Sequence, residues 1–508
     1  MHRPLFLSLL LCAACASDNH DPIPLLPLTE APLATERSLR LAHTMQSLPD
    51  RAPSDPTMLR ALLAEGWGET MAGLGEAIAS HTVDGSPAPT PTSPGKLLVR
   101  FAHLADTQLA DDESPARVVM FDTMSSTYAS YRPQEGWGCL MLNAAVRTLN
   151  KVHESNPLEF VLLGGDNSDN AQTNEVDWFQ SILDGAPRVE CDSGADDDPV
   201  PGGNNDPKDP FIGIGLTVPW RWVTGNHDVL NQGNFPTSTR VDEYLANFSS
   251  LGTRDWAQPG APTTNGPVVP DMRRQPLDRA SLMAKVAADR DGHGITEADK
   301  AGGRAYYHFD VAGGAVRIVV MDTASESGGA DGVLHRADLE TYVRPALVEA
   351  EAQGKYVILV SHHGATTLTD GSDIGGVKQS DAVLTDEWRS FLGGFPHVLL
   401  HLGAHTHLFR VSAVTPPAVG TAATHAYFEA ETDSLADWPG QVRLFEVWDY
   451  GNYIAVKAIP VDYSTENDPI TAEARRRQAL DYATGWVDPT VGPGADDARA
   501  VEMWFKKP

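Results

Sequence analysis

Short apolar segments rich in Val, Ile and Leu alternate with segments of helical periodicity through most of the chain. This alternation is the strongest constraint on the fold, because it is typical of an α/β domain in which helices connect the strands of a sheet. We expect strands at 97–104, 160–163, 221–223, 316–321, 356–360 and 398–402, and helices that include 139–153 and 337–352. After residue 407 we expect strands alone, at 408–411, 442–447 and 453–459.

Five of these strands end in side chains of the kinds that bind metal ions. The five motifs are Asp106-Thr107-Gln108, Gly165-Asp166-Asn167-Ser168-Asp169-Asn170, Gly225-Asn226-His227-Asp228, His362-His363 and Gly403-Ala404-His405-Thr406-His407. Ligands of open α/β sheets bind beyond the carboxyl ends of the strands, so these loops can meet at one point. Carboxylate, amide oxygen and imidazole together suit Mn, Fe or Zn. The set has enough ligands for two ions, which a shared carboxylate can bridge.

Each motif alone also has an ordinary structural explanation. Gly-Asp-Asn is a common turn, and a His-His pair is more often hydrogen-bonded or solvated than bound to a metal. His405 and His407 lie on one face of an extended segment, which is a metal-ligand spacing that half-buried barrel histidines also adopt. The order of all five motifs, each at a strand end, favours a metal site.

This ordered set resembles the calcineurin-like metallophosphoesterase superfamily, in its secreted bacterial, lipoprotein-type branch, whose pattern is D-x-H, G-D-x-x, G-N-H-[DE], H, G-H-x-H. The resemblance covers about residues 97–412. It implies a four-layer α-β-β-α sandwich with two mixed sheets and a metal site at the carboxyl ends of the strands. It also implies a metal-dependent hydrolase that cleaves phosphate mono- or diesters with a metal-bound hydroxide.

Position by position, the resemblance assigns ligands to two metal ions. Those of the first ion are Asp106, Gln108, Asp166 and His407. Those of the second are Asp166, which bridges, Asn226, His362 and His405, with His363 as an alternative to His362. The resemblance makes His227 a catalytic residue that faces the scissile phosphate, stabilising charge or protonating the leaving oxygen, while Asp228 fixes its tautomer.

Two positions depart from the pattern of the superfamily. Gln108 stands where a His is usual, and exchanging an imidazole for an amide oxygen favours Mn over Zn or Fe in the first site. Ala404 replaces the Gly of G-H-x-H, which concerns the backbone more than the ligands.

The positive charges near the motifs bear on the choice between a phosphodiester and a phosphomonoester substrate. No Lys or Arg lies inside the five motifs, which favours a phosphodiester over a phosphomonoester, unless Arg117, Arg132 or Arg221 reaches the site. The alternative function is a surface-anchored protein that binds metal or phosphate without turnover. With 68 acidic and 38 basic residues and a formal charge of -30, the chain is not expected to bind duplex nucleic acid.

The N-terminus has the features of an export signal. Residues 1–15 are predicted to be a signal peptide of the lipoprotein type, with Cys15 lipidated as the only membrane contact, and ordinary signal-peptidase cleavage is the alternative. The protein is therefore expected outside the cytoplasm, in the periplasm or on the outer membrane or cell surface. In such an oxidising compartment Cys139 and Cys191 can form a disulfide.

The rest of the chain divides by composition. Residues 16–95 are expected to form a helical segment, with its helical pattern at 54–81, and a Pro-rich linker; 96–460 form the metallophosphoesterase domain, and 461–508 a loosely ordered tail. The insertions 188–219 and 231–303 are expected to border the cleft. The stretch 289–300 is similar to the start of an EF-hand loop but ends at Lys300, so a polar loop and a calcium site are both open there. The same two alternatives hold for the acidic stretch 192–209.

Overall fold

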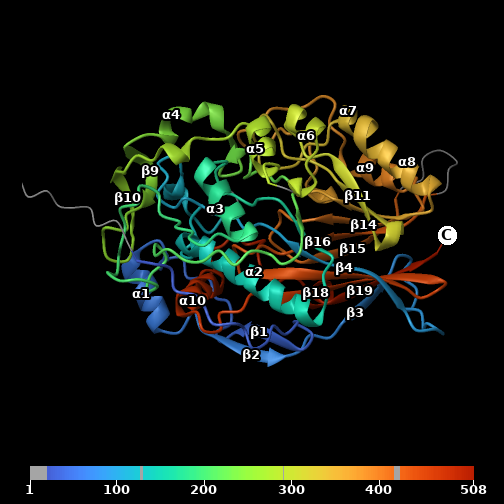
Figure 1. Ribbon diagram of the computed structural model, residues 1–508, viewed down its shortest axis with the longest axis horizontal. Helices are drawn as coiled ribbons and strands as arrows, with labels where there is room; N and C mark the ends of the chain where they lie inside the picture. Colours follow the sequence, from blue (N-terminus) through green and yellow to red (C-terminus); the bar gives the residue numbers. More distant parts are fainter. Residues whose placement is uncertain (1–19, 126–129, 290, 417–423, 508) are drawn as a thin grey trace, which may run out of the picture.

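The computed structural model describes residues 20–125, 130–289, 291–416 and 424–507. Two large mixed sheets pack face to face, and helices cover the outer side of each (Figure 1). The α/β sandwich predicted from the sequence is confirmed. Within the described residues, no helix has the length and apolar character needed to span a membrane. The predicted signal peptide lies outside the described residues.

The first sheet has seven strands and includes the last strand of the chain. In spatial order these are β3 (Ala79–Thr82), β19 (Val501–Lys506), β18 (Tyr453–Asp462), β17 (Gln441–Asp449), β4 (Lys96–Leu104), β5 (Phe160–Leu163) and β6 (Trp220–Arg221). β4, β5 and β6 run parallel, and β17 joins β4 in the antiparallel sense. The carboxyl ends of β4 and β5 therefore lie at one edge, as the predicted site requires.

The second sheet has six strands. Their spatial order is β11 (Tyr307–Val311), β12 (Val316–Val320), β13 (Tyr356–Val360), β14 (Val398–Gly403), β16 (Tyr427–Glu431) and β15 (Arg410–Val414). β12, β13, β14 and β16 are parallel, and the two edge strands are antiparallel to their neighbours. β13 and β14 thus also end side by side.

Aromatic side chains connect the two sheets through their inner faces. Phe160 of the first sheet meets Phe309 of the second edge to face at 5.2 Å, and Phe428 meets Phe505 in the same way at 5.2 Å. Such pairs add to the gain from burying apolar area, so they fix how the sheets face one another. All four rings lie in or against the main apolar core.

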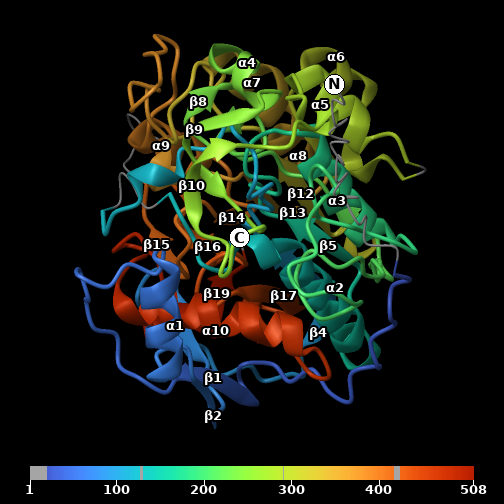
Figure 2. The ribbon, with the colours of Figure 1, turned by 90° about the vertical axis from the view of Figure 1, so that its left-hand side faces the viewer.

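Helices complete the outer layers (Figure 2). On the first sheet lie α2 (Gly138–Ser155), α3 (Thr173–Asp184) and α10 (Pro469–Thr484), with α2 in contact with both of the others. On the second sheet lie α7 (Arg336–Asp338), which continues through one π turn into α8 (Arg344–Ala352), and α9 (Thr385–Leu392). A second apolar cluster, which includes Leu347 and Trp388, fills the space beneath them. The helices predicted at 139–153 and 337–352 are confirmed.

The N-terminal segment is less helical than predicted. The helix α1 (Pro56–Ala64) stops at Gly66, whose φ of 89° ends it. The chain then forms β2 (Thr70–Leu74), which pairs with β1 (Arg37–Leu41). The strand β3 follows β2 in sequence. The predicted helical pattern at 54–81 was wrong beyond the first turns, because the glycines that follow favour a turn over a helix.

The prediction of a loosely ordered C-terminal tail was also wrong. Residues 461–508 form α10, the short α11 (Asp496–Arg499) and β19, which pairs with both β18 and β3. In β19, Val501, Met503 and Phe505 are buried at the two-residue spacing of a strand, and Trp504 between the last two is buried as well. Leu480 of α10 packs on Leu59 of α1, so the two ends of the chain support each other.

The insertion 231–303 folds into small elements around the main sandwich. These are the hairpins β7 (Leu230–Asn231) with β8 (Phe235–Pro236) and β9 (Phe248–Arg254) with β10 (Thr263–Pro267), and the helices α4 (Val241–Tyr244), α5 (Arg279–Val286) and α6 (Glu297–Gly302). In the stretch similar to an EF-hand, Asp289 and Asp291 contact the two ring nitrogens of His293 at 2.5 and 2.8 Å. These two carboxylates therefore have a partner in the chain.

Candidate metal centre

Backbone hydrogen bonds connect the five strand-end loops. The amide of Asp106 donates to Gly165 O at 3.1 Å, and that of Gln108 donates to Asp166 O at 2.8 Å. In the other sheet, Ala404 N donates to His362 O at 2.8 Å, and Ala404 is fully buried. The amide of His405 also donates to Asp106 Oδ2 at 3.3 Å, so loops 299 residues apart in sequence are held at one place.

The predicted ligand atoms converge where the loops meet. Asp166 Oδ2 lies 3.1 Å from His362 Nε2, and Asp106 Oδ1 lies 3.2 Å from His407 Nε2 and 3.9 Å from His362 Nε2. One ligand atom each from Asp106, Asp166 and His362 lies within 4.8 Å of the others, and the same is true of His362, His363 and His405. Gln108, Asn226, His405 and His407 line the cavity above.

Four of these atoms are buried and have no hydrogen-bond partner within the part of the chain that the structure describes. They are Asp106 Oδ1, Gln108 Oε1, Asn226 Oδ1 and His362 Nε2. An unpaired buried polar atom costs about 1–3 kcal/mol, so four of them in one place require an explanation. A bound cation supplies it, because each of the four is a lone-pair donor of a kind that Mn, Fe and Zn accept. The residues therefore fit a metal centre.

The backbone at five of the seven predicted ligands is strained. The φ angles are 48° at Asp106, 41° at Gln108, 53° at Asp166, 69° at His405 and 50° at His407. Residues other than glycine rarely adopt positive φ, and such residues gather at functional sites, where the surrounding structure holds them. The side chains of these five residues lie in the ligand cluster or line its cavity.

The buried charges of the site shift the pKa values of its histidines in opposite directions. Burial acts to lower the pKa of His407, but Asp106 and Asp437 outweigh it and raise that pKa to about 10. For His405, burial together with the neighbouring His363 and His362 lowers the pKa well below its usual value. His405 is thus held neutral, which is the form in which a histidine binds a metal ion.

His363 is occupied by other contacts. Its Nδ1 lies 2.9 Å from Thr323 Oγ1, and its Nε2 lies 2.9 Å from Ala330 O. In the ring of His362, in contrast, Nδ1 lies 2.8 Å from Gly164 O, while Nε2 faces the carboxylates of Asp166 and Asp106 and has no hydrogen-bond partner among the described residues. Of the two alternatives left by the sequence, these contacts favour His362 as the ligand.

The partner of His227 differs from the predicted one. His227 Nδ1 lies 2.9 Å from Asp169 Oδ1, and its Nε2 lies 3.9 Å from Asp166 Oδ2, on the side of the centre. The expectation that Asp228 fixes the tautomer of His227 was wrong. The Asp228 carboxylate is fully buried and accepts hydrogen bonds from the backbone amides of Gly225, Asn167 and Ser168 at 2.8–3.0 Å. The Asp228 carboxylate therefore joins the loop after β5 to its own loop and does not contact the His227 ring.

One further residue, Asp437, was missed from the sequence, while Arg132, one of the three arginines considered there, does line the site. Asp437 contacts His407 Nδ1, and Arg132 holds Asp437 through two hydrogen bonds of 2.7 and 3.1 Å. Asp169, the partner of His227, belongs to one of the five motifs, so the sequence indicated that it lies near the site. Asp437 and Arg132 lie outside all the motifs, in segments that only the fold brings near. Of the other arginines, Arg117 pairs with Glu135, and Arg221 stacks on Phe309.

Two neighbouring cavities open onto the centre. One of about 420 Å³ is lined by the predicted ligands, by Arg132 and Arg410, and by the C-terminal segment that includes Trp486, Asp488 and Val491. The other, of about 770 Å³, is lined partly by insertion 231–303. Among the described residues, none of 188–219 lines either cavity, so the expectation that this insertion borders the cleft was wrong. It lies beside Trp256 and α10.

The fold and the centre define an α/β sandwich with a cluster of metal-type ligands at its strand ends. No protein-family model matches the chain, and no curated protein matches it. Among solved structures, one titled "Structure of PhoD" aligns with 78% of this chain and 70% of its own, at 10% identity and a TM-score of 0.31.

Proposed function

We propose that the protein is a metal-dependent phosphoester hydrolase of the calcineurin-like type. The observation that most supports this function is the convergence of four buried, unpartnered ligand atoms beside His227, whose ring is held by Asp169. A site that only binds metal does not need a non-ligating histidine next to the ligands.

The seven predicted ligands would hold two ions. Asp106, Gln108, Asp166 and His407 would bind the first, and Asp166, Asn226, His362 and His405 the second, with Mn favoured over Fe or Zn because Gln108 offers an amide oxygen. When bound, such ions polarise the phosphoryl group and lower the pKa of the attacking water.

The role of His227 follows from its surroundings. Asp169 accepts a hydrogen bond from Nδ1, so Nε2 is directed toward the centre and the cavity. A proton on Nε2 can stabilise the charge that develops on the phosphoryl oxygens or pass to the leaving oxygen. His227 needs no covalent bond to the substrate for either role.

A phosphodiester suits the cavity better than a phosphomonoester. Arg132 already donates two hydrogen bonds to Asp437, and Arg410 lies 3.7 Å from Glu431. The cavity wall also includes Asp481 and Asp488. A dianionic monoester needs additional cations, while a diester with one negative charge needs fewer.

The place of the protein in the cell follows from its cysteines. Cys139 and Cys191 form a disulfide, with their sulfurs 1.96 Å apart. Such bonds persist in oxidising compartments, which supports the predicted position outside the cytoplasm. Lipid attachment at Cys15 stays a prediction, because that residue lies outside the described residues.

The test compares hydrolysis of bis-p-nitrophenyl phosphate and p-nitrophenyl phosphate by the purified protein with Mn²⁺. We expect turnover, faster on the diester, that is lost in Asn226→Ala and retained in Asp488→Asn, which changes a cavity residue outside the ligand set. Stoichiometric metal binding without turnover under Mn²⁺, Zn²⁺ or Fe²⁺ would favour the alternative, a protein that binds metal or phosphate without turnover.

A further inference from the structure

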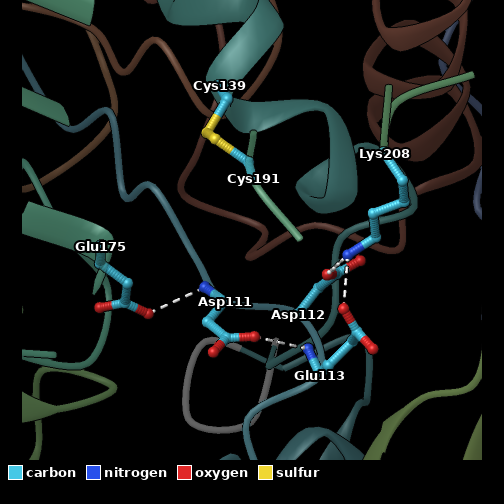
Figure 3. Close-up of a disulfide and its surroundings, with 7 residues drawn as sticks. All are labelled: Asp111, Asp112, Glu113, Cys139, Glu175, Cys191 and Lys208. Carbon is cyan, nitrogen blue, oxygen red and sulfur yellow. Dashed lines mark hydrogen bonds and ion pairs between the residues drawn. A yellow bond between two sulfur atoms is a disulfide. The ribbon is translucent and has the colours of Figure 1, made fainter. Parts of the chain in front are cut away.

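A second group of carboxylates lies under the disulfide, away from the candidate metal centre. Figure 3 shows Asp111, Asp112 and Glu113 below the Cys139–Cys191 bond, with Lys208 above two of them. One carboxylate oxygen each from Glu113, Asp192 and Asp197 lies within 4.8 Å of the others. We call these three residues the loop carboxylates, since two of them belong to the insertion 188–219.

Asp192 is the residue that requires an explanation. Its side chain is 3% exposed, and its Oδ1 has no hydrogen-bond partner among the described residues. Its Oδ2 accepts one hydrogen bond, from Asp197 N at 3.3 Å. The Oδ2 atom of Asp197 is likewise buried and unpartnered within the described chain. Two such oxygens in one cluster lose their hydration without replacement.

The charge of the cluster is not balanced by the chain. Lys208 is 1% exposed, and its Nζ lies 2.9 Å from Asp112 Oδ1 and 2.7 Å from Glu113 Oε2. Asp112 also has Arg254 Nε 3.6 Å from its Oδ2, but the structure shows no ion pair to Asp192 or Asp197 among the described residues. Buried carboxylates without a counter-charge are strongly unfavourable, so a further cation would stabilise them.

The neighbouring buried carboxylate of Asp111, in contrast to that of Asp192, has several hydrogen-bond partners. Asp111 is 2% exposed and receives Arg274 Nε at 2.9 Å, Ser193 Oγ at 2.7 Å and Asn174 Nδ2 at 2.8 Å. Ser193 directly follows Asp192 in sequence, so both carboxylates share the same surroundings. Of these two carboxylates, Asp192 is the one that has an unpaired oxygen among the described residues.

We propose that Glu113, Asp192 and Asp197 bind a calcium ion that holds the insertion 188–219 against the sandwich. The cluster offers oxygen ligands and no imidazole, which suits a hard cation. Calcium accepts irregular sets of carboxylate, carbonyl and water ligands, as a loop of this kind provides, while Mg²⁺ demands a near-ideal octahedron. Calcium also suits the oxidising compartment in which the adjacent disulfide persists, because extracellular calcium sites work at weak affinity.

Terbium luminescence tests the proposal without any assay of activity. Trp256 Nε1 donates to Asp112 Oδ2 at 3.0 Å, so Trp256 lies next to the cluster and can sensitise a bound Tb³⁺ ion. We expect metal-free protein to show Trp-sensitised emission that Ca²⁺ displaces. Asp192→Asn should weaken calcium binding by about tenfold or more, because it removes a charged ligand. Glu190→Gln, in the same insertion but outside the cluster, should not change it.

A parallel titration separates this site from the candidate metal centre. Asn226→Ala removes a predicted ligand of that centre and should leave the calcium response intact, whether or not the proposed hydrolase function is correct. An emission that disappears in Asn226→Ala and persists in Asp192→Asn would overturn the proposal. The absence of calcium-displaceable emission would also overturn the proposal, because it would mean that the loop carboxylates bind no calcium ion.

Thermal unfolding distinguishes a ligand from a structural carboxylate. Calcium should raise the unfolding temperature of the unmodified protein and of Glu190→Gln, but not that of Asp192→Asn. Without calcium, Asp192→Asn should be at least as stable as the unmodified protein, because it removes an uncompensated buried charge. A lower unfolding temperature in that condition would contradict the proposal. Asp197→Asn provides the same comparison if Asp192→Asn does not fold.

Discussion

Asp437 accepts a hydrogen bond from His407 Nδ1 at 2.5 Å, while the opposite ring nitrogen, Nε2, lies 3.2 Å from Asp106 Oδ1. An ionised carboxylate can only accept, so Nδ1 carries a proton, and Nε2 would present its lone pair to a bound cation once its own proton is released. Arg132 donates to both oxygens of Asp437 and fixes its orientation. Asp437 thus positions a predicted ligand without contacting a metal itself.

Asp437→Asn should weaken binding of the ion that His407 helps to hold by about 10–100-fold, the usual effect of losing the partner of a metal-binding histidine. The amide can donate to Nδ1 and so favour the wrong tautomer. Calorimetric titration of metal-free protein with Mn²⁺ measures the change. Asp481→Asn is the control, since Asp481 lines the same cavity without a hydrogen bond to a ligand. Equal affinities in the two variants would contradict the role of Asp437.

Asp169→Asn and Asp228→Asn should have different effects. Asp169 holds the ring of His227, so its change should lower kcat by about tenfold or more and alter the pH profile of kcat, at unchanged metal content. Asp228 accepts three backbone amides, so its change should lower the free energy of unfolding by about 1–3 kcal/mol. Steady-state kinetics and urea unfolding measure the two effects. A larger loss of kcat in Asp228→Asn would restore the assignment made from the sequence.

Gln108→His should change the metal preference of the first site. The amide oxygen of Gln108 is buried and unpartnered, and its Nε2 lies 3.4 Å from Asp166 Oδ2. An imidazole at this position favours Zn²⁺ over Mn²⁺ relative to an amide, so the ratio of the two affinities should shift toward Zn²⁺ by about tenfold. Competition between the two ions, followed by metal analysis, measures the ratio. An unchanged ratio would mean that Gln108 is not a ligand.

The sequence predicts the central strands and the strand-end motifs well, for a physical reason. β5 and β13 are buried on both faces, so they appear as continuous apolar segments, and their shortness favours strands over helices. Their ends must be polar if they line a site. The five motifs therefore predict residues that the fold brings together, although their role as ligands remains a prediction.

Contacts between distant segments could not be predicted in this way. Asp437 meets His407 only because the loop before β17 crosses the ends of both sheets, and no local pattern in the sequence marks that crossing. β19 shows the alternation of a strand, yet the Gly and Pro residues before it resemble a disordered tail, and only pairing with β18 decides between them. His227 could not be paired with Asp169 rather than Asp228 because adjacency in sequence does not determine where a side chain points.

The Cys139–Cys191 disulfide should contribute mainly to stability. It spans 52 residues and joins α2 to the insertion 188–219, outside the candidate metal centre. Replacing both cysteines with serine should lower the free energy of unfolding by about 2–4 kcal/mol, since the unfolded chain regains its freedom. Urea unfolding measures this loss, and hydrolysis of bis-p-nitrophenyl phosphate should be unchanged under native conditions. A loss of hydrolysis greater than the loss of folded protein would contradict the separation of the two regions.

His401, at the centre of β14, should make the protein sensitive to acid. Trp388 Nε1 donates to its Nδ1 at 3.2 Å, and its Nε2 lies 2.9 Å from Ser361 Oγ, an arrangement that holds a neutral ring. Burial lowers the pKa of His401 to about 4; Glu429 opposes the shift and Arg389 adds to it. Because the folded protein binds this proton less tightly than the unfolded chain, the stabilisation is complete above pH of about 6.5 and is lost as the pH falls toward 4.

The size of that loss can be measured by comparing His401→Gln with the unmodified protein. A folded pKa near 4 corresponds to at most about 3 kcal/mol between the two limits. Urea unfolding at pH 7.5 and pH 4.5 should show a larger fall in the free energy of unfolding for the unmodified protein, because glutamine does not titrate. Other histidines titrate equally in both proteins, so the difference isolates His401. Parallel pH dependences would mean that His401 is protonated as readily in the folded protein as in the unfolded chain.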